Sequence, residues 1–337
     1  MPHWSVYTGS NKPHDGIAEL PDPPPWRAFD GGPVLPPPAD TEDESAISPD
    51  RVHRARTYVA TPESVQLVNA ALCLRRPLLV TGLPGTGKSS LAYAVARELG
   101  LGPVLRWNIT SRSTLADGLY QYDPLSRLYA ARADGARPES DGVADHLRLG
   151  PLGTALLPYD RPRVLLIDEI DKSDLDLPND LLNVLEEGQY EIPELVRAAR
   201  HSADGTAEVR TAGTDTAVTV TKGRVRCRAF PFVVLTSNGE REFPPAFLRR
   251  CVQLKLLVPD RARLTDIVRA HLGDIDERTE SLINAFLHRA RAGELATDQL
   301  LNAIYLTGVA GLDAASREQL AEHLMPYLST AEDSDGF

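Results

Sequence analysis

The chain has 337 residues, a formal net charge of −11 and 42% hydrophobic residues, which is enough for roughly two domains with buried cores. The acidic balance argues against a general nucleic-acid-binding surface, because phosphate binding requires positive charge. No apolar run reaches the ~18 residues of a membrane-spanning helix, and the N-terminal residues MPHWSVYTGSNKPHDG lack the pattern of a signal peptide.

Residues 1–57 are rich in proline and poor in periodic apolar positions. Such a segment buries too little apolar surface to offset its ordering entropy, so we expect a largely extended, polyproline-prone arm. Its motif PPPWRAF carries Trp26 and Phe29. Two interpretations are open: the arm is a linker, or these aromatic residues dock on a neighbouring subunit or a partner.

Residues 58–258 alternate strand-like and helical segments. Thr61 and Pro62 mark a helix start, and a later helix ends at Gly100. Buried strands are expected within PLLVT, PVLRWNI, RVLLIDEI, FPFVVLTSN and CVQLKLLV. This alternation predicts an α/β sandwich with a parallel, five-stranded sheet.

Two inserts interrupt that pattern, near residues 111–150 and 191–229. In the second insert, alternating Val and Thr around Gly213 and Gly223 predict one or two β-hairpins. Residues 259–328 have helical periodicity and predict a small all-helical lid domain. The acidic residues 329–337 are expected to form a disordered tail.

The chain has three cysteines and eight histidines. Because Cys73, Cys227 and Cys251 are far apart and odd in number, we expect them to be reduced and buried in a cytoplasmic protein. The histidines show no metal-ligand spacing, so no metal site is assigned to them.

The segment GLPGTGKS matches the phosphate-binding pattern G-x-x-x-x-G-K-[ST] between a strand and a helix. Its glycines allow backbone N–H groups to surround phosphate oxygens at a helix N-terminus. Lys88 is expected to reach the β- and γ-phosphates, and Ser89 to offer its hydroxyl to Mg²⁺. The predicted nucleotide-binding residues are Gly82, Pro84, Gly85, Thr86, Gly87, Lys88, Ser89 and Ser90, with Tyr58 and Val59 near the adenine.

Polar residues follow two later strands. Asp168 and Glu169 end VLLIDE, and adjacent strand residues point to opposite faces, so the two carboxylates can have different roles. We expect Asp168 to hold Mg²⁺ and Glu169 to polarise the attacking water. Asn238, at the end of LTSN, is a candidate for positioning that water, although asparagine after a strand is commonly a turn residue. Asp171 and Lys172 are interpreted as supporting or surface residues.

These motifs resemble the AAA+ ATPases, and more specifically their MoxR branch within the helix-2-insert group. The resemblance spans roughly residues 58–305 and rests on LLVTGLPGTGKSSLA, GPLGTALL, VLLIDEIDKSDLDLPNDLLNVLEEG, LTSN and EFPPAFLRRC. It implies an ATP- and Mg²⁺-dependent ATPase that forms a homo-oligomer, a hexameric ring, and remodels a client or adaptor protein. The MoxR resemblance implies a von Willebrand factor A-domain protein as that partner.

The resemblance also gives a meaning to the adjacent Arg249 and Arg250, which have no acidic residue within PPAFLRR. In AAA+ rings an arginine at this place reaches the neighbouring subunit's nucleotide and neutralises charge on the γ-phosphate. Guanidinium suits this role because it is planar and permanently charged. Arg250 is the first candidate for this arginine finger and Arg249 the second, and neither would then have its target within its own chain. The alternative is a structural pair on the surface.

In the same branch the two inserts face a central pore, where they could contact a client. One departure concerns the lid. Many AAA+ proteins carry a lid arginine that touches the γ-phosphate, whereas ELATDQLLNAIYL has none and begins a helix at Thr297 and Asp298. That role is therefore not assigned to any residue.

Two other functions stay open. An ATP-controlled scaffold or switch in a bacterial multi-component signalling or defence system would need assembly more than turnover, and the intact Glu169 and Asn238 count against it. A DNA-directed NTPase is disfavoured by the acidic charge, although KGRVRCR, residues 222–228, is a local basic segment.

Overall fold

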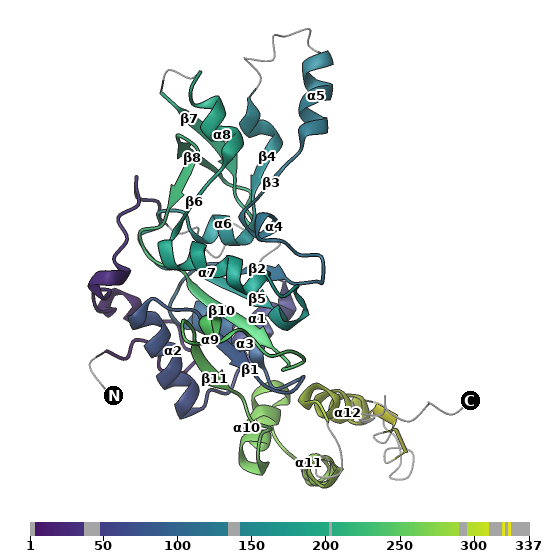
Figure 1. The fold of residues 1–337 in the computed structure, drawn as a ribbon. Coiled ribbons are helices and arrows are strands. Elements are labelled where there is room, and N and C mark those ends of the chain that lie inside the picture. The colour runs from purple at the N-terminus through teal and green to yellow at the C-terminus, as the bar shows by residue number, and fades with distance from the viewer. Residues whose placement is uncertain are drawn as a thin grey trace.

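The computed structural model describes residues 4–36, 48–133, 142–201, 204–289, 295–309, 319–320 and 323–324. Its main sheet contains β1 (Leu78–Thr81), β2 (Leu105–Asn108), β5 (Val164–Asp168), β10 (Phe232–Ser237) and β11 (Val252–Lys255). All pairs in this sheet are parallel, in the order β11-β1-β10-β5-β2 (Figure 1). The predicted parallel, five-stranded α/β sandwich is confirmed.

The alternation of side chains along these strands builds one core on each face of the sheet. Leu78 and Leu166 belong to the core that also contains residues of α2 (Pro62–Leu74) and α3 (Lys88–Glu98). Leu79 and Ile167 belong to the core that contains residues of α6 (Pro151–Ala155) and α7 (Leu177–Glu187). Because helices cover both faces, the central strands β1, β10 and β5 are largely buried, whereas the edge strands β2 and β11 alternate buried and exposed residues.

Local signals fix the helix ends near the sheet. At the start of α2, the Thr61 hydroxyl accepts a hydrogen bond from the Ser64 N–H at 3.1 Å, and the Ser64 hydroxyl accepts one from the Thr61 N–H at 2.9 Å. Thr61 is therefore the N-cap, as predicted. The helix α3 ends just before Gly100, which has a φ of +59°.

The inserts fold into a second sheet of mixed strands, in the order β3-β4-β7-β8-β9-β6. Its strands are β3 (Tyr120–Tyr122), β4 (Leu147–Leu149), β6 (Gln189–Glu191), β7 (Thr206–Arg210), β8 (Ala217–Thr221) and β9 (Arg224–Arg226). The antiparallel pairs β7–β8 and β8–β9 are the hairpins predicted around Gly213 and Gly223. The inserts also form α4 (Leu115–Leu119), α5 (Pro124–Ala133), η3 (Val143–His146) and α8 (Pro193–Ala198).

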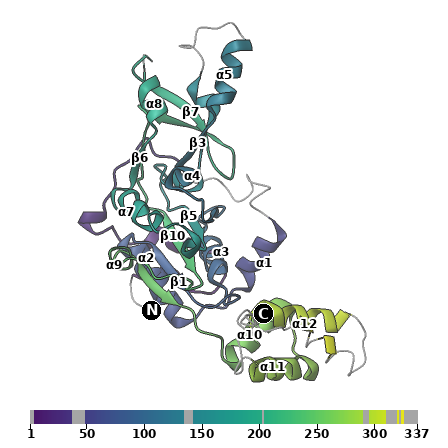
Figure 2. The ribbon, with the colours of Figure 1, turned by 45° about the vertical axis from the view of Figure 1, so that its right-hand side comes forward.

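The second sheet extends away from the main sheet at the end opposite the C-terminal helices (Figures 1 and 2). Those helices are α10 (Arg261–Leu272), α11 (Glu277–Arg289) and α12 (Thr297–Val309), and they share a core that includes Val268, Phe286 and Leu300. A helical lid region is therefore present. The helix expected in SREQLAEHLMPYL lies largely outside the described residues, as does the acidic tail.

The proline-rich arm packs against its own chain. Much of it is extended, interrupted by η1 (Gly16–Glu19) and η2 (Pro25–Arg27), but its last nine residues form the helix α1 (Pro49–Thr57) instead of the expected extended segment. Tyr7 is fully buried, and the buried carboxylate of Glu98 accepts the N–H groups of Thr8, Gly9 and Asn11. The arm is thus docked in cis rather than left in solvent.

Two smaller expectations can be compared with the structure. All three cysteines are free; Cys227 and Cys251 are buried as predicted, whereas Cys73 is only half-buried. Across the helices that the structure describes, none is long and apolar enough to cross a membrane. Two further short elements complete the description, η4 (Ile170–Lys172) and α9 (Pro245–Leu248).

Candidate functional site

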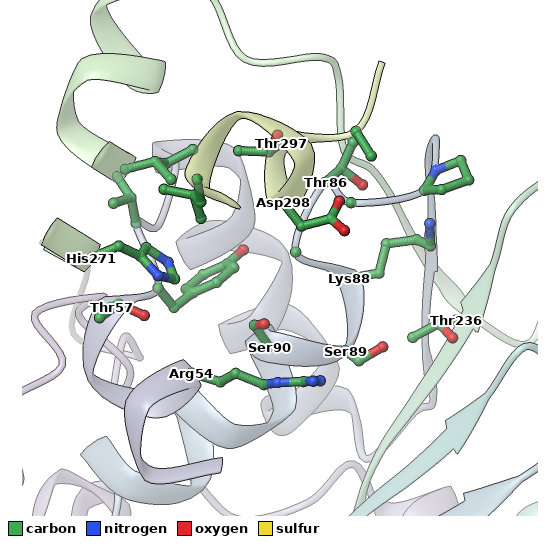
Figure 3. A pocket seen from close by; sticks show the side chains of 18 of the residues that line it. Arg54, Thr57, Thr86, Lys88, Ser89, Ser90, Thr236, His271, Thr297 and Asp298 are labelled. Atoms are coloured by element: carbon green, nitrogen blue, oxygen red, sulfur yellow. The ribbon is translucent and has the colours of Figure 1, made fainter. Parts of the chain in front are cut away.

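A cavity of about 580 Å³ opens where α1, the loop before α3 and the lid helices meet (Figure 3). Its volume suits a nucleotide-sized ligand. The main domain contributes Arg54, Thr57, Tyr58, Val59, Pro84, Gly85, Thr86, Gly87, Lys88, Ser89, Ser90, Asp168, Glu169, Thr236 and Asn238. The lid contributes Arg263, Ile267, His271, Ala296, Thr297, Asp298, Gln299 and Leu301.

The glycine-rich loop wraps one side of this cavity. Gly85 and Gly87 have φ values of +75° and +86°, which favour glycine, and Gly87 is the N-cap of α3. A Cβ at Gly85 would lie 2.7 Å from the Cβ of Ala296, so the loop and the lid are in close contact. Gly82 is not among the lining residues, but its carbonyl holds the lysine described next.

Lys88 is buried, with 8% of its surface exposed. Its Nζ donates to the carbonyl oxygens of Gly82 at 2.7 Å and Leu83 at 2.9 Å. Burial lowers the pKa of Lys88, while Asp171, Asp168 and Glu169 oppose that shift. The ammonium group is therefore held against the glycine-rich loop, with carboxylates nearby, in a position where it can bind a phosphate.

Asp168 is the centre of a polar cluster at the carboxyl ends of the strands. Its Oδ1 accepts hydrogen bonds from the hydroxyls of Ser89 at 2.7 Å and Thr236 at 2.6 Å. Its Oδ2 accepts one from Arg106 Nη2 at 3.2 Å. The structure thus brings together Ser89 and Asp168, the two residues expected to share a metal ion.

This donor set fits a hard divalent cation. A hydroxyl and a carboxylate oxygen are the ligands that Mg²⁺ takes from proteins when phosphates and waters complete its shell. In the described part of the chain, no group of three or more His, Cys, Asp or Glu side chains is arranged to hold a metal ion.

Glu169 follows Asp168 in a left-handed conformation, with a φ of +62°. Its N–H donates to the Thr236 hydroxyl at 2.9 Å, so Thr236 joins both carboxylate residues. The Glu169 Oε2 lies 2.9 Å from Lys172 Nζ, and both side chains are more than two-fifths exposed. Lys172, interpreted from sequence as a supporting or surface residue, therefore directly contacts the expected catalytic carboxylate.

Asn238 lines the cavity, and hydrogen bonds from its loop to Asp171 hold that loop in place. The buried Asp171 accepts the N–H groups of Asn238 at 2.8 Å, Gly239 at 3.1 Å and Glu240 at 3.2 Å. Asp171 is thus a supporting residue that orients the end of β10. The Asn238 side chain lies 3.5 Å from the Glu240 carboxylate and makes no hydrogen bond to Glu169.

Tyr58 and Val59, the residues expected near the adenine, also line the cavity. Beside them are His271 and Ile267 of α10 and Arg54 of α1 (Figure 3). His271 Nδ1 lies 3.0 Å from the Nε2 of His53, which joins the lid to α1. Burial and the neighbouring His53 lower the pKa of His271 to about 4, so His271 is neutral near pH 7.

The arginine pair lies outside this cavity. Arg250 Nε is 3.2 Å from Glu186 Oε1, and Arg250 Nη1 donates to the carbonyl of Ala246 at 3.1 Å. Arg250 therefore pairs with an acidic residue that is distant in the sequence and lies outside PPAFLRR. Arg249 is exposed, and within the described residues its guanidinium makes no ion pair.

Sequence reasoning missed Arg106, Thr236, Arg54 and His271. The first two lie on strands whose neighbours in the sheet are distant in sequence, so no local pattern marks them as partners of Asp168. Alternation gives a weak signal for Arg106, the exposed residue between buried Leu105 and Trp107. Arg54 and His271 come together only when the lid packs.

Two solved structures resemble the chain at low identity. A candidate ATPase from Cytophaga hutchinsonii is 14% identical, with a TM-score of 0.38 over 66% of this chain and 54% of the other. NtrX from Brucella abortus in complex with ADP is 16% identical, with a TM-score of 0.41 over 84% of this chain and 59% of the other. The chain thus spans between half and three-fifths of these proteins.

No curated protein sequence matches the chain. The model of the AAA domain, dynein-related subfamily, matches residues 77–251, which is just over half of the 337 residues and includes the glycine-rich loop, Asp168, Glu169 and both arginines. The chain therefore belongs to the dynein-related AAA domain family.

Proposed function

We propose that this ATPase hydrolyses Mg²⁺-bound ATP at sites completed by assembly of a homo-oligomeric, hexameric ring, and uses the cycle to remodel a partner protein in the cytoplasm. The observation that carries the proposal is the cluster at Asp168. A phosphate-binding loop, a lysine, a metal-type oxygen pair and a second carboxylate converge on one nucleotide-sized cavity.

Each residue of the cluster then has a chemical role. Lys88 leaves the carbonyls of its own loop and pairs with the β- and γ-phosphates. Ser89 and Asp168 would hold Mg²⁺, which when bound would supply positive charge to stabilise the phosphates. Glu169 accepts the proton of the attacking water, and Asn238 orients that water from the neighbouring strand end.

The arginine pair supplies the remaining positive charge from a neighbouring subunit. Two observations favour Arg249 over Arg250 as the residue that reaches out, the reverse of the order expected from sequence. Arg249 is exposed, whereas Arg250 is held by Glu186 and the Ala246 carbonyl. We assign the reaching guanidinium to Arg249 and an anchoring role to Arg250.

The second sheet is the proposed client-binding part. It extends from the nucleotide domain, and α5 at its end exposes Leu125, Leu128 and Tyr129, at 62%, 47% and 65% of their surfaces. Exposed apolar side chains at the end of an insert suit contacts with another protein. The resemblance to the MoxR branch supports a von Willebrand factor A-domain protein as adaptor.

A DNA-directed function has less support. In the basic segment 222–228, Arg224 Nε lies 2.8 Å from Glu191 and Arg226 Nη1 lies 2.8 Å from Asp30. Two of the basic side chains are therefore already paired with carboxylates, which reduces their attraction for phosphate.

ATP hydrolysis per subunit, measured over a wide range of protein concentration, tests the proposal. A rate that rises with concentration and then saturates, in parallel with assembly followed by sizing, is the expected result. The variant Glu169→Gln should bind ATP, assemble and lose turnover. ATP binding and assembly without any hydrolysis in the wild-type protein would instead favour the scaffold function.

A further inference from the structure

Arg27 of the arm is buried and contacts Glu186, the residue that also pairs with Arg250, although it belongs to a segment with the composition of a linker. Only 4% of its surface is exposed. Nε and Nη2 donate to the Arg75 carbonyl, and Nη2 also donates to the Leu185 carbonyl at 3.0 Å. Nη1 donates to the carbonyl of Glu186 at 3.0 Å and to its Oε2 at 3.3 Å. These contacts use all five N–H donors of a guanidinium.

Aromatic packing fixes the plane of this guanidinium. Its central carbon lies 4.6 Å from the ring centre of Phe230 and 5.3 Å from that of Phe29, and the two rings are stacked at 5.5 Å. Phe29 reaches this place because Gly188 ends α7: a Cβ there would lie 2.5 Å from the Phe29 ring, and its φ is +61°. Arg27 is therefore built into the fold, whereas Trp26 beside it is 76% exposed.

The carboxylate of Glu186 joins Arg27 to the arginine pair. One oxygen faces Arg27, and the other lies 3.2 Å from Arg250 Nε. A second connection runs through the two residues that follow α2. Arg27 binds the carbonyl of Arg75, and the next residue, Arg76, donates from Nη1 to the carbonyl of Arg249 at 3.0 Å. Arg250 is thus held by Glu186, which Arg27 contacts directly. Arg249 is held through its carbonyl by Arg76, which is next to the residue whose carbonyl Arg27 binds.

From these contacts we propose that the N-terminal arm positions the arginine finger: Arg27, acting through Glu186, fixes Arg250 so that Arg249 projects toward the neighbouring subunit's nucleotide. This inference rests on the proposed function, because it gives the arm a part in a site completed by assembly. Arg27 and Glu186 are positioning residues. They lie outside the cavity of their own chain.

The physical reason is geometric. Arg249 is on the surface at the end of the short helix α9, which has only four residues and needs external anchors to keep its direction. A shift of about 1 Å in a group that stabilises a transition state costs up to roughly 100-fold in rate. Weakening the contacts that connect Arg27 to Arg250 through Glu186 should therefore lower turnover without changing nucleotide affinity.

The test compares Arg27→Ala, Glu186→Gln, Arg250→Ala and Arg249→Ala for kcat, nucleotide dissociation constant and assembly. Glu186→Gln is included in case Arg27→Ala fails to fold. Glu186 is at the surface and glutamine has nearly the same shape as glutamate, so this variant is expected to fold. Asp30→Ala is the matched control: it removes another ion pair of the arm, with Arg226, and touches neither Glu186 nor the arginine pair.

We expect Arg27→Ala and Glu186→Gln to lower kcat of the assembled protein by roughly 10-fold or more, with the nucleotide dissociation constant unchanged and Asp30→Ala normal. In an Arg250→Ala background, Glu186→Gln should cause no further loss of kcat, because its target is gone. A residue that only stabilises the fold would give an additive loss or none.

Two failures can be told apart. If Arg249→Ala and Arg250→Ala both hydrolyse ATP at the wild-type rate, the finger itself is refuted, and with it the proposed function. If Arg249→Ala is inactive while Glu186→Gln keeps the wild-type kcat, the finger stands and the positioning role of the arm is refuted.

Discussion

At the scale of single residues, the proposed nucleotide binding centres on Lys88 and on the cluster around Asp168. In the structure the Lys88 ammonium is bound to two carbonyls of its own loop, so a phosphate has to replace those contacts. Hydrogen bonds between an ammonium and a phosphate are charge-assisted and stronger than those to carbonyls. The exchange therefore favours the nucleotide-bound state.

Lys88→Ala removes the ammonium group that would bind the phosphates. We expect it to weaken ATP binding by at least about 10-fold, which is what the loss of one charge-assisted contact produces. Titration calorimetry or a fluorescent nucleotide measures the change. Lys255→Ala, on the exposed side of β11, is the control and should bind normally. Equal affinity of both variants would show that the loop does not hold the phosphates.

Lys172 restrains Glu169 by an exposed ion pair at 2.9 Å. Such pairs contribute about 0.2–1 kcal/mol. Lys172→Ala frees the carboxylate to meet the attacking water, so we expect turnover to rise by at most about fivefold, since 1.36 kcal/mol corresponds to tenfold. Steady-state hydrolysis at saturating ATP measures it, and Lys172→Arg should resemble the wild-type protein. A large fall in kcat would instead assign Lys172 a direct part in the reaction.

Much of the candidate site could be predicted because its motifs are local. The glycine-rich loop, Asp168 and Glu169 each follow a strand within one continuous segment. Thr236 and Arg106 could not be predicted, because their contact with Asp168 depends on the order β10-β5-β2 in the sheet. The pairing of Arg250 with Glu186 was missed for the same reason, since α7 and α9 are distant in sequence.

At the scale of whole elements, the lid meets α1 through His53 and His271. The pKa of His271 is lowered to about 4 in the fold, against about 6.5 when unfolded. The unfolded chain therefore binds more protons between these values, and the free energy of unfolding should fall as pH falls from about 6.5 toward 4. Above about pH 6.5 this contribution is fully present.

His271→Asn tests that dependence, because asparagine is polar but does not titrate. We expect the wild-type protein to lose more stability than the variant between pH 7 and pH 5, measured by denaturant unfolding at each pH. His288→Asn, on α11 and away from the cavity, is the control. Parallel pH profiles of wild type and His271→Asn would contradict a neutral, partly buried His271.

The elements of the main sheet were predicted well, because each strand carries a short apolar or alternating pattern and the helix caps are local. The second sheet was predicted only as hairpins, since β3 and β4 join β7 across some 60 residues of sequence, as the register of Arg148 with Arg210 shows. Composition predicted an extended arm, and the backbone is extended over much of its length. Its docking rests on a few residues, Tyr7, Arg27 and Phe29, that composition cannot single out.

For the molecule as a whole, the arm links two places that an assembly would couple. Near its start, Asn11 donates a hydrogen bond to the carbonyl of Tyr58, which lines the nucleotide cavity. Further on, Arg27 binds Glu186 beside the arginine pair. One segment therefore contacts the wall of the chain's own site and the residues proposed to complete the next one.

The most direct test of a site completed between subunits is ATP hydrolysis by a mixture of Lys88→Ala and Arg249→Ala. Each variant alone should be inactive. In an equal, random mixture one interface in four pairs an intact loop with an intact arginine, so about a quarter of the wild-type rate per subunit should return. A mixture that stays inactive although sizing shows that the two variants co-assemble would contradict this account.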